Sequence, residues 1–161
     1  MRAYPLIFRF SAVVANAAFR ARVRGTGRAL AVWEEGEWWC SGVEPGGLTE
    51  PGGSPVDAYL RFRKTLGEIL GELAEECGST ERFSQRVGAF FAQRDEDDLA
   101  RWHEALLMLR RGELSLTQDV ARLPRETART SAAVEIEGTN DFHEQPELLS
   151  LADPEPLTRA A

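Results

Sequence analysis

Few residues in this chain have the types and spacing that catalysis requires. His103 lies inside a predicted helix and His143 in an acidic C-terminal segment, and no serine or cysteine is placed to use either as a general base. Cys40 and Cys77 are expected to be reduced core thiols, because two cysteines without histidines at ligand spacing make no zinc site. We therefore expect no catalytic residues and a protein that is not an enzyme.

Acidic and glycine-rich stretches give no stronger sign of chemistry. The four acids from Asp95 to Asp98 are too close in sequence to converge on one ion in a helix, so they are interpreted as a helix start. Gly46-Gly47 and Gly52-Gly53 have no Lys-Ser/Thr after them, so they indicate turns and not a phosphate-binding loop. We expect neither a metal site nor a cofactor.

One stretch combines large aromatic side chains with acidic ones. Three tryptophans flank three glutamates where two strand-like segments, 29–33 and 38–43, meet at a short glycine-containing turn. Aromatic surface with an acidic rim is typical of a protein interface that takes a basic partner. The plain alternative is that the tryptophans belong to the core and the glutamates are only solvated. The candidate partner-binding residues are Trp33, Glu34, Glu35, Glu37, Trp38 and Trp39.

Both faces of these two strands are apolar. Leu30 and Val32 point to one side of the first strand, while Ala29, Ala31 and Trp33 point to the other. A single helix covers only one face of such a sheet. The second face therefore requires more of the chain, a second copy or a foreign partner.

The clearest helix start is Ser54-Pro55-Val56-Asp57. It offers a hydroxyl at the N-cap, proline at the first helical position and a carboxylate at N3, which we expect to accept from the Ser54 amide. Apolar residues then recur at helical spacing as far as Leu73. This pattern predicts an α+β fold, with a largely antiparallel sheet of three to four strands and the 54–77 helix across one face.

The run from Arg28 to Leu73 resembles the HicB-like antitoxin domain. The similarity lies in Glu44-Pro45-Gly46-Gly47 after the second strand, a brief third strand at 48–50, and Gly52-Gly53-Ser54 with Asp57-Ala58 opening the helix. Pro51 makes the third strand an edge strand or an irregular one. The resemblance implies a partial double-stranded-RNA-binding-like fold and a bacterial protein that binds and neutralises a small basic ribonuclease toxin of the HicA type.

The N-terminal residues are basic. Residues 1–28 contain six arginines and no acid. Residues 1–18 are interpreted as an arm or an extra strand, with a secretion signal or a transit peptide as alternatives. Phe19 to Arg24 alternates like a half-buried strand, and Gly25-Thr26-Gly27 predicts a turn after it. The alternating arginines are interpreted as a solvated face, with an anion or RNA contact as the alternative.

The chain after the long helix divides into two parts. Helices are predicted from Ser79 or Thr80 to about Arg94 and from Asp95 to Gly112, either covering the second face of the sheet or forming a separate hairpin. From 113 to 161, ten acids outnumber four bases, which predicts a largely disordered tail that adds little to stability, with a short helix near Leu116 to Leu123. The predicted organisation is thus 1–18, a module at 19–78, a helical extension at 79–112 and a tail at 113–161.

Composition limits the partners. A net charge of −7 and a pI near 5.0 disfavour a chain-wide nucleic-acid surface, and no segment has the length of a membrane span. We expect a cytoplasmic homo-oligomer that binds a small basic protein. The alternative is a transcriptional regulator that contacts DNA through the N-terminal arginines or a weak helix-turn-helix-like segment at 116–137.

Overall fold

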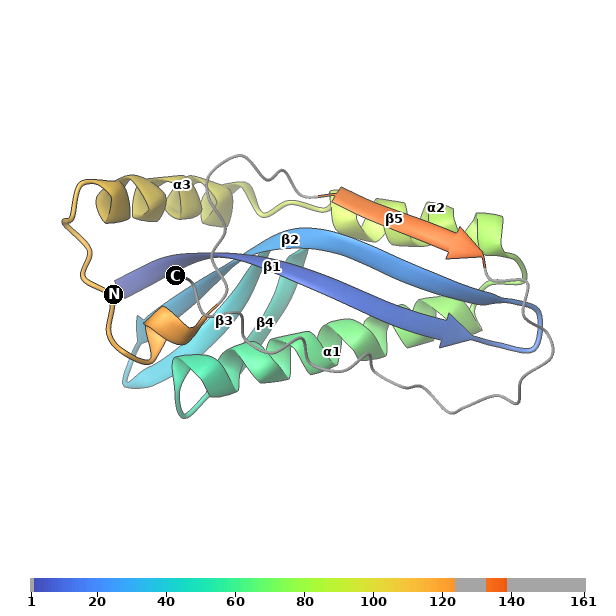
Figure 1. Ribbon diagram of the computed structural model, residues 1–161, viewed down its shortest axis with the longest axis horizontal. Coiled ribbons are helices and arrows are strands. Elements are labelled where there is room, and N and C mark those ends of the chain that lie inside the picture. The colour runs from blue at the N-terminus through green and yellow to red at the C-terminus, as the bar shows by residue number, and fades with distance from the viewer. Residues whose placement is uncertain (1, 124–132, 139–161) are drawn as a thin grey trace.

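A computed structural model describes residues 2–123 and 133–138 and shows an α+β fold (Figure 1). A twisted antiparallel sheet lies between helices, and the long helix that follows the fourth strand packs along one face of it. The elements are β1 (Arg2–Ala15), β2 (Arg20–Glu34), β3 (Glu37–Glu44), β4 (Gly46–Gly52), α1 (Pro55–Glu75), α2 (Thr80–Ala92), α3 (Glu96–Arg110), a short 3-10 helix η1 (Val120–Arg122) and β5 (Ala133–Gly138).

The sheet has five strands, in the order β1-β2-β3-β4, with β5 also paired to β2. β2 is long enough to pair with two strands along the same edge. Its first half, from Ala21 to Thr26, pairs with β5, and its second half, from Arg28 to Glu34, pairs with β3. β1 runs antiparallel along the whole opposite edge of β2. Residues 2–15 therefore form the extra strand that was one of the sequence-based alternatives.

The predicted turn at Gly25-Thr26-Gly27 is wrong, because β2 continues through these residues without a break. Gly27 is needed for close approach and not for a turn. A Cβ at Gly27 would lie 2.4 Å from Cζ of Phe8 and 2.7 Å from the carbonyl oxygen of Glu44. The glycine leaves room for the Phe8 ring on one side of β2 and for the irregular pairing with β3 on the other.

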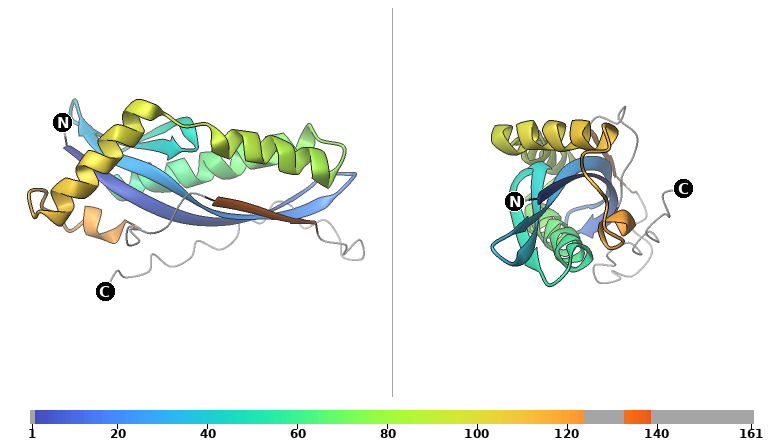
Figure 2. Two further views of the ribbon diagram at one scale, coloured as in Figure 1. Left: turned by 90° about the horizontal axis from the view of Figure 1, so that it is seen from above. Right: turned by 90° about the vertical axis from the view of Figure 1, so that its left-hand side faces the viewer.

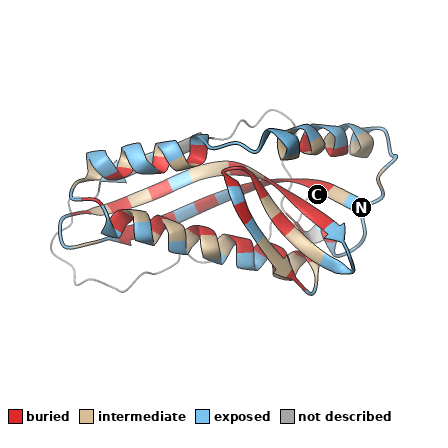
Figure 3. Cartoon of the chain, turned by 180° about the vertical axis from the view of Figure 1, so that it is seen from behind, coloured by how far each residue is buried: buried red, intermediate tan, exposed pale blue. Residues whose placement is uncertain are grey.

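Helices cover both faces of the sheet (Figure 2). One face carries the main core, where Phe62 of α1 packs against Phe8 of β1 and Phe83 of α2 packs against Phe19. The opposite face carries a smaller core, in which Trp102 of α3 packs with Leu30 and other apolar residues of the sheet. α3 therefore supplies the cover that the second face requires. More and less buried positions alternate from Arg9 to Ala15 of β1 and from Arg20 to Arg24 of β2, whereas Tyr4 to Phe8 and Ala29 to Val32 are buried on both faces (Figure 3).

The start of α1 uses the predicted cap with one difference. Oγ of Ser54 accepts a hydrogen bond from the Asp57 amide at 3.0 Å, and Pro55 opens the helix. The Asp57 carboxylate, however, accepts from the amide of Gly53 at 2.9 Å and not from that of Ser54. This bond lowers the pKa of Asp57, with a further contribution from Arg61.

Part of the chain after Gly112 belongs to the core. Val120 and Leu123 are buried in the main cluster, and β5 adds a strand to the sheet. The burial of these two side chains predicts that this part of the region contributes to stability, in contrast to what its composition indicates. The short helix predicted near Leu116 to Leu123 corresponds to η1. The rest of the predicted tail, 124–132 and 139–161, lies outside the described residues, as does His143. Within the described residues, no helix has the length and apolar character needed to cross a membrane.

Candidate partner-binding site

The tip of the β2–β3 hairpin is a two-residue turn. Glu34 pairs with Glu37, so only Glu35 and Gly36 connect the strands. Both residues have positive φ, 52° at Glu35 and 85° at Gly36, as a type I′ turn requires. Glycine adopts this conformation without strain, but the first position normally favours asparagine, aspartate or glycine. A glutamate is thus held in a conformation that its side chain disfavours.

The three tryptophans do not form one surface. Trp33 and Trp38 are directly opposite each other across the two strands, with ring centroids 5.4 Å apart. Trp38 also contacts Tyr4 of β1, at 6.1 Å between centroids, so this pair lies on the face that carries the main core. Trp39 lies on the other face, against the smaller core under α3. Strand alternation requires this division because Trp38 and Trp39 are consecutive residues.

Trp33 is the most exposed of the three. Its side chain is 39% exposed, whereas Trp38 and Trp39 are half-buried. Large aromatic side chains are usually withdrawn further from water than this. Trp33 rests on Trp38, which is itself fixed by Tyr4. The result is a supported aromatic surface at the end of the hairpin that is open on one side.

All three glutamates are exposed, and two of them face each other. Glu34 and Glu37 form a cross-strand pair, on the same face as Trp39 and opposite to Trp33 and Trp38. Like charges directly opposite each other destabilise a strand pair by a few tenths of a kcal/mol. Glu35 adds a third carboxylate in the turn itself. The tip therefore concentrates negative charge at a cost to its own folding.

This arrangement can attract and bind positively charged side chains of another macromolecule. It offers carboxylates on one face, an exposed indole on the other, and a rigid two-residue turn between them. Among residues 2–123 and 133–138, no group of three or more His, Cys, Asp or Glu side chains is placed to hold a metal ion. Of the six candidate residues, the structure brings Trp33 and Trp38 together on one side and Glu34, Glu37 and Trp39 on the other.

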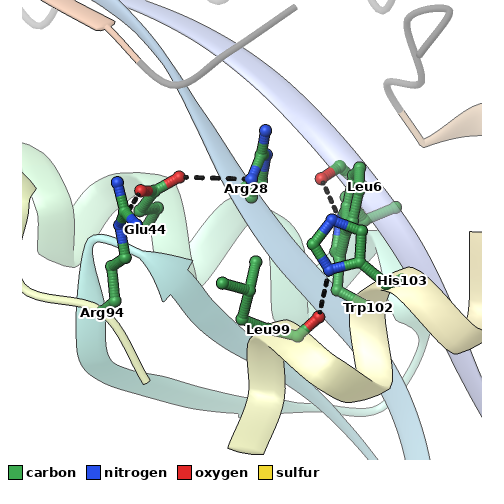
Figure 4. Close-up of polar contacts among 7 residues, drawn as sticks. All are labelled: Leu6, Arg28, Glu44, Arg94, Leu99, Trp102 and His103. Carbon is green, nitrogen blue, oxygen red and sulfur yellow. Dashed lines mark hydrogen bonds and ion pairs between the residues drawn. The ribbon is translucent and has the colours of Figure 1, made fainter. Parts of the chain in front are cut away.

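A second polar cluster, centred on Glu44, was not recognised in the sequence (Figure 4). Glu44 is 6% exposed and is the buried charged residue at the end of β3. Its carboxylate forms ion pairs with Arg28 at 3.6 Å and with Arg94. The Arg28 guanidinium also lies 5.0 Å from the ring centre of Trp102, a cation–π contact. The only available sequence signal was an acid next to proline within an apolar strand.

The contacts around Glu44 indicate a structural role. Its neighbour Gly46 donates to the carbonyl of Gln93 at 2.8 Å, and the amide of Asp95 donates to the carbonyl of Val43 at 3.3 Å. The Trp102 indole donates to the carbonyl of Leu6 at 3.0 Å. These bonds attach the α2–α3 connection and α3 to the sheet. They explain how α3 is held over the second face.

The other titratable residues considered in the sequence have ordinary structural roles. His103 is exposed, and its Nδ1 lies 2.9 Å from the carbonyl of Leu99, one helical turn earlier. Burial, with a smaller effect of Glu50, raises the pKa of the Cys40 thiol far above its usual range, so this thiol is unreactive at neutral pH. Burial also raises the pKa of Asp98, an effect that Arg101 partly offsets. Asp95 caps α3 by accepting from the Asp98 amide at 2.9 Å.

A cleft of about 540 Å³ opens beside the first residues of β1, between α3 and the segment at 113–115. Its lining has opposite charges, with Arg2 and Arg101 near Glu104 and Glu113. Because the charges balance, the cleft favours neither an anion nor a cation.

No family model matches the chain, and no significant match was found among curated proteins or among solved structures.

Proposed function

We propose that the protein is a protein-binding module that uses the tip of the β2–β3 hairpin to bind and neutralise a small basic protein. The proposed partner is a ribonuclease toxin of the HicA type, the class that the resemblance of residues 28–73 to HicB-like antitoxins implies. The order of β2, β3, β4 and α1 is the order of elements that this resemblance leads us to expect.

One observation carries the proposal: the Glu34–Glu37 pair directly beside Glu35 in a tight turn. A hairpin selected only for stability would place opposite charges or a threonine pair there, and asparagine or glycine in the turn. Residues that break local rules without a local gain are expected at functional sites. A basic partner would relieve this repulsion, and the exposed Trp33 would supply apolar contact area.

The experiment starts from the neighbouring gene. If that gene encodes a short basic protein, the pure protein should cleave RNA, and this chain should inhibit the cleavage. The variant Glu34→Lys/Glu35→Lys/Glu37→Lys should then associate about ten- to a hundred-fold more slowly at low salt, because charges at the rim of an interface act mainly on the encounter rate. Stopped-flow tryptophan fluorescence measures that rate.

A matched control separates local from overall charge. The variant Glu68→Lys/Glu72→Lys/Glu75→Lys changes three exposed glutamates on α1 by the same charge, away from the hairpin. We expect a much smaller effect on association from this control, and unchanged circular dichroism for both variants. Equal rates for the two variants would refute the hairpin as the binding surface.

The structure gives the DNA-binding alternative no specific support. On β2, Arg22 pairs with Glu137 of β5 and Arg24 pairs with Glu135, and the Arg24–Glu137 side chains approach to 4.0 Å. Acidic side chains beside the arginines reduce the positive potential that phosphate binding needs. Residues 133–137 of the helix-turn-helix-like segment lie in a strand.

A further inference from the structure

The cleft beside the first residues of β1 has two walls that are attached to the sheet (Figure 1). α3 forms one wall, and its Trp102 indole donates to the carbonyl of Leu6 in β1 at 3.0 Å. The segment 113–115 forms the other wall, where the hydroxyl of Tyr4 donates to the carbonyl of Ser115 at 3.4 Å. The cleft is therefore formed before any ligand arrives, and binding does not have to order its walls.

The charged side chains of the cleft have both signs. Arg101 is held by Asp98, at 2.7 Å between Nη1 and Oδ1. In the part of the chain that the structure describes, Arg2, Glu104 and Glu113 form no ion pair with one another or with other side chains. A ligand that carries one positive and one negative charge can pair with both kinds of group, whereas an ion of either sign also meets like charge.

β1 presents backbone groups to the same cleft. The amide of Asn16 donates to the carbonyl of Phe19 at 2.9 Å, which makes this pair a hydrogen-bonded one. Hydrogen-bonded pairs alternate with non-hydrogen-bonded pairs, so the even-numbered residues of β1 bond to β2. The N–H and C=O of Ala3, which lines the cleft, therefore point away from β2. An extended peptide residue placed beside Ala3 can exchange two hydrogen bonds with it.

The remaining lining is apolar and leaves room for more than one side chain. Ala105 of α3 is buried, and Met108 and Leu114 are half-buried. The volume of about 540 Å³ lies within the range of small-molecule sites and exceeds what a single amino acid fills. Aliphatic side chains are the groups that gain most from contact with such a lining.

We propose that this cleft binds a short peptide that has free termini and aliphatic side chains and is about three residues long. The peptide carboxylate pairs with Arg2, and the peptide ammonium group pairs with Glu104 and Glu113. One peptide residue exchanges hydrogen bonds with Ala3, and the side chains lie against the apolar lining. The described lining includes none of the candidate residues of the hairpin tip, so this inference goes beyond the proposed function.

Isothermal titration calorimetry of the full chain with trileucine tests the site. We expect trileucine to bind with a Kd below about 1 mM. Trileucine amide lacks the carboxylate and acetyl-trileucine lacks the ammonium group, so each should bind at least about fivefold more weakly, because one charge-assisted interaction is lost. The absence of binding by trileucine would overturn the proposal, as would equal affinities for the three peptides.

Substitutions in the protein test the role of each charge. In Arg2→Gln, trileucine and trileucine amide should bind equally, because the partner of the carboxylate is gone. In Glu104→Gln/Glu113→Gln, trileucine and acetyl-trileucine should bind equally. Arg82→Gln and Glu81→Gln change exposed side chains on α2 and should keep the wild-type preference for the uncapped peptide. A cleft variant that keeps this preference would contradict the proposed pairing. The comparison of the three peptides uses the unmodified chain, so it decides the proposal even if a variant fails to fold.

Discussion

At the scale of single residues, the side chain of Asn16 makes four hydrogen bonds that link β1 to α1 and to its own turn. Its Nδ2 donates to the carbonyls of Ala74 and Cys77, at 2.6 and 2.8 Å, at the end of α1. Its Oδ1 accepts from the amides of Ala18 and Phe19. One side chain thus closes the β1–β2 turn and donates to two carbonyls at the end of α1, of which that of Ala74 also accepts from the Cys77 amide. In the sequence, Asn16 lies within the predicted arm or extra strand at 1–18, where no role was predicted for it.

Asn16→Asp tests this role. The variant keeps the acceptor but loses both N–H donors, and it places a negative charge against the negative end of α1. We expect it to reduce the free energy of unfolding by roughly 2–4 kcal/mol at neutral pH, measured by urea denaturation. Ala17→Asp is the control, because Ala17 is exposed in the same turn and should change stability by less than about 0.5 kcal/mol. Equal stabilities would show that the contacts to α1 contribute nothing.

At the scale of elements, the sequence predicted what depends on local pattern. Three features follow from residues that are close in sequence: the Ser54 cap, the turn near Gly36, and the two faces of β2. Leu30 and Val32 lie on one of these faces, and Ala29 and Ala31 lie on the other. The separation of Trp38 from Trp39 onto opposite faces also follows from alternation, so the six candidate residues could have been divided between two faces in advance. Their partner-binding role stays a prediction.

What the sequence did not predict depends on contacts between distant segments. Gly25 and Gly27 indicated a turn, but β2 stays paired with β1 through these residues, and the Phe8 ring fills the space beside Gly27. The pairing of β5 with β2 joins residues more than a hundred positions apart. No local propensity reports such a pairing, because its stability comes from the partner strand and the core beneath it.

Gly27→Ala tests the interpretation of β2 as a continuous strand. The added methyl group would collide with the Phe8 ring and with a backbone carbonyl, so we expect a loss of about 1–3 kcal/mol in the free energy of unfolding. Gly88→Ala in α2 is the matched control. Apart from the backbone of its own helix, no heavy atom of the described residues lies within 4 Å of the new Cβ, and replacing a helical glycine should stabilise the protein by about 0.5–1 kcal/mol. If Gly27→Ala also stabilises the protein, the close approach at Gly27 is refuted.

At the scale of the whole molecule, the segment after α3 connects the two cores. α3 covers one face of the sheet, and the chain then passes around β1 so that Val120 and Leu123 join the main cluster beneath the other face. The charge excess of this region predicts that it adds little to stability, whereas the burial of Val120 and Leu123 predicts a local contribution. Average composition does not report these two residues, because they are few within a long charged stretch.

Leu123→Ala measures how much this anchor contributes. Leu123 is 2% exposed, so its truncation should leave a cavity in the main core and reduce the free energy of unfolding by about 2–4 kcal/mol. Leu116→Ala removes the same atoms seven residues earlier, where the side chain is 42% exposed, and should cost less than about 0.5 kcal/mol. Urea denaturation of both variants gives the comparison. Because the two substitutions are chemically identical, a difference between them reports burial alone, whereas equal small effects would mean that the segment is not anchored in the core.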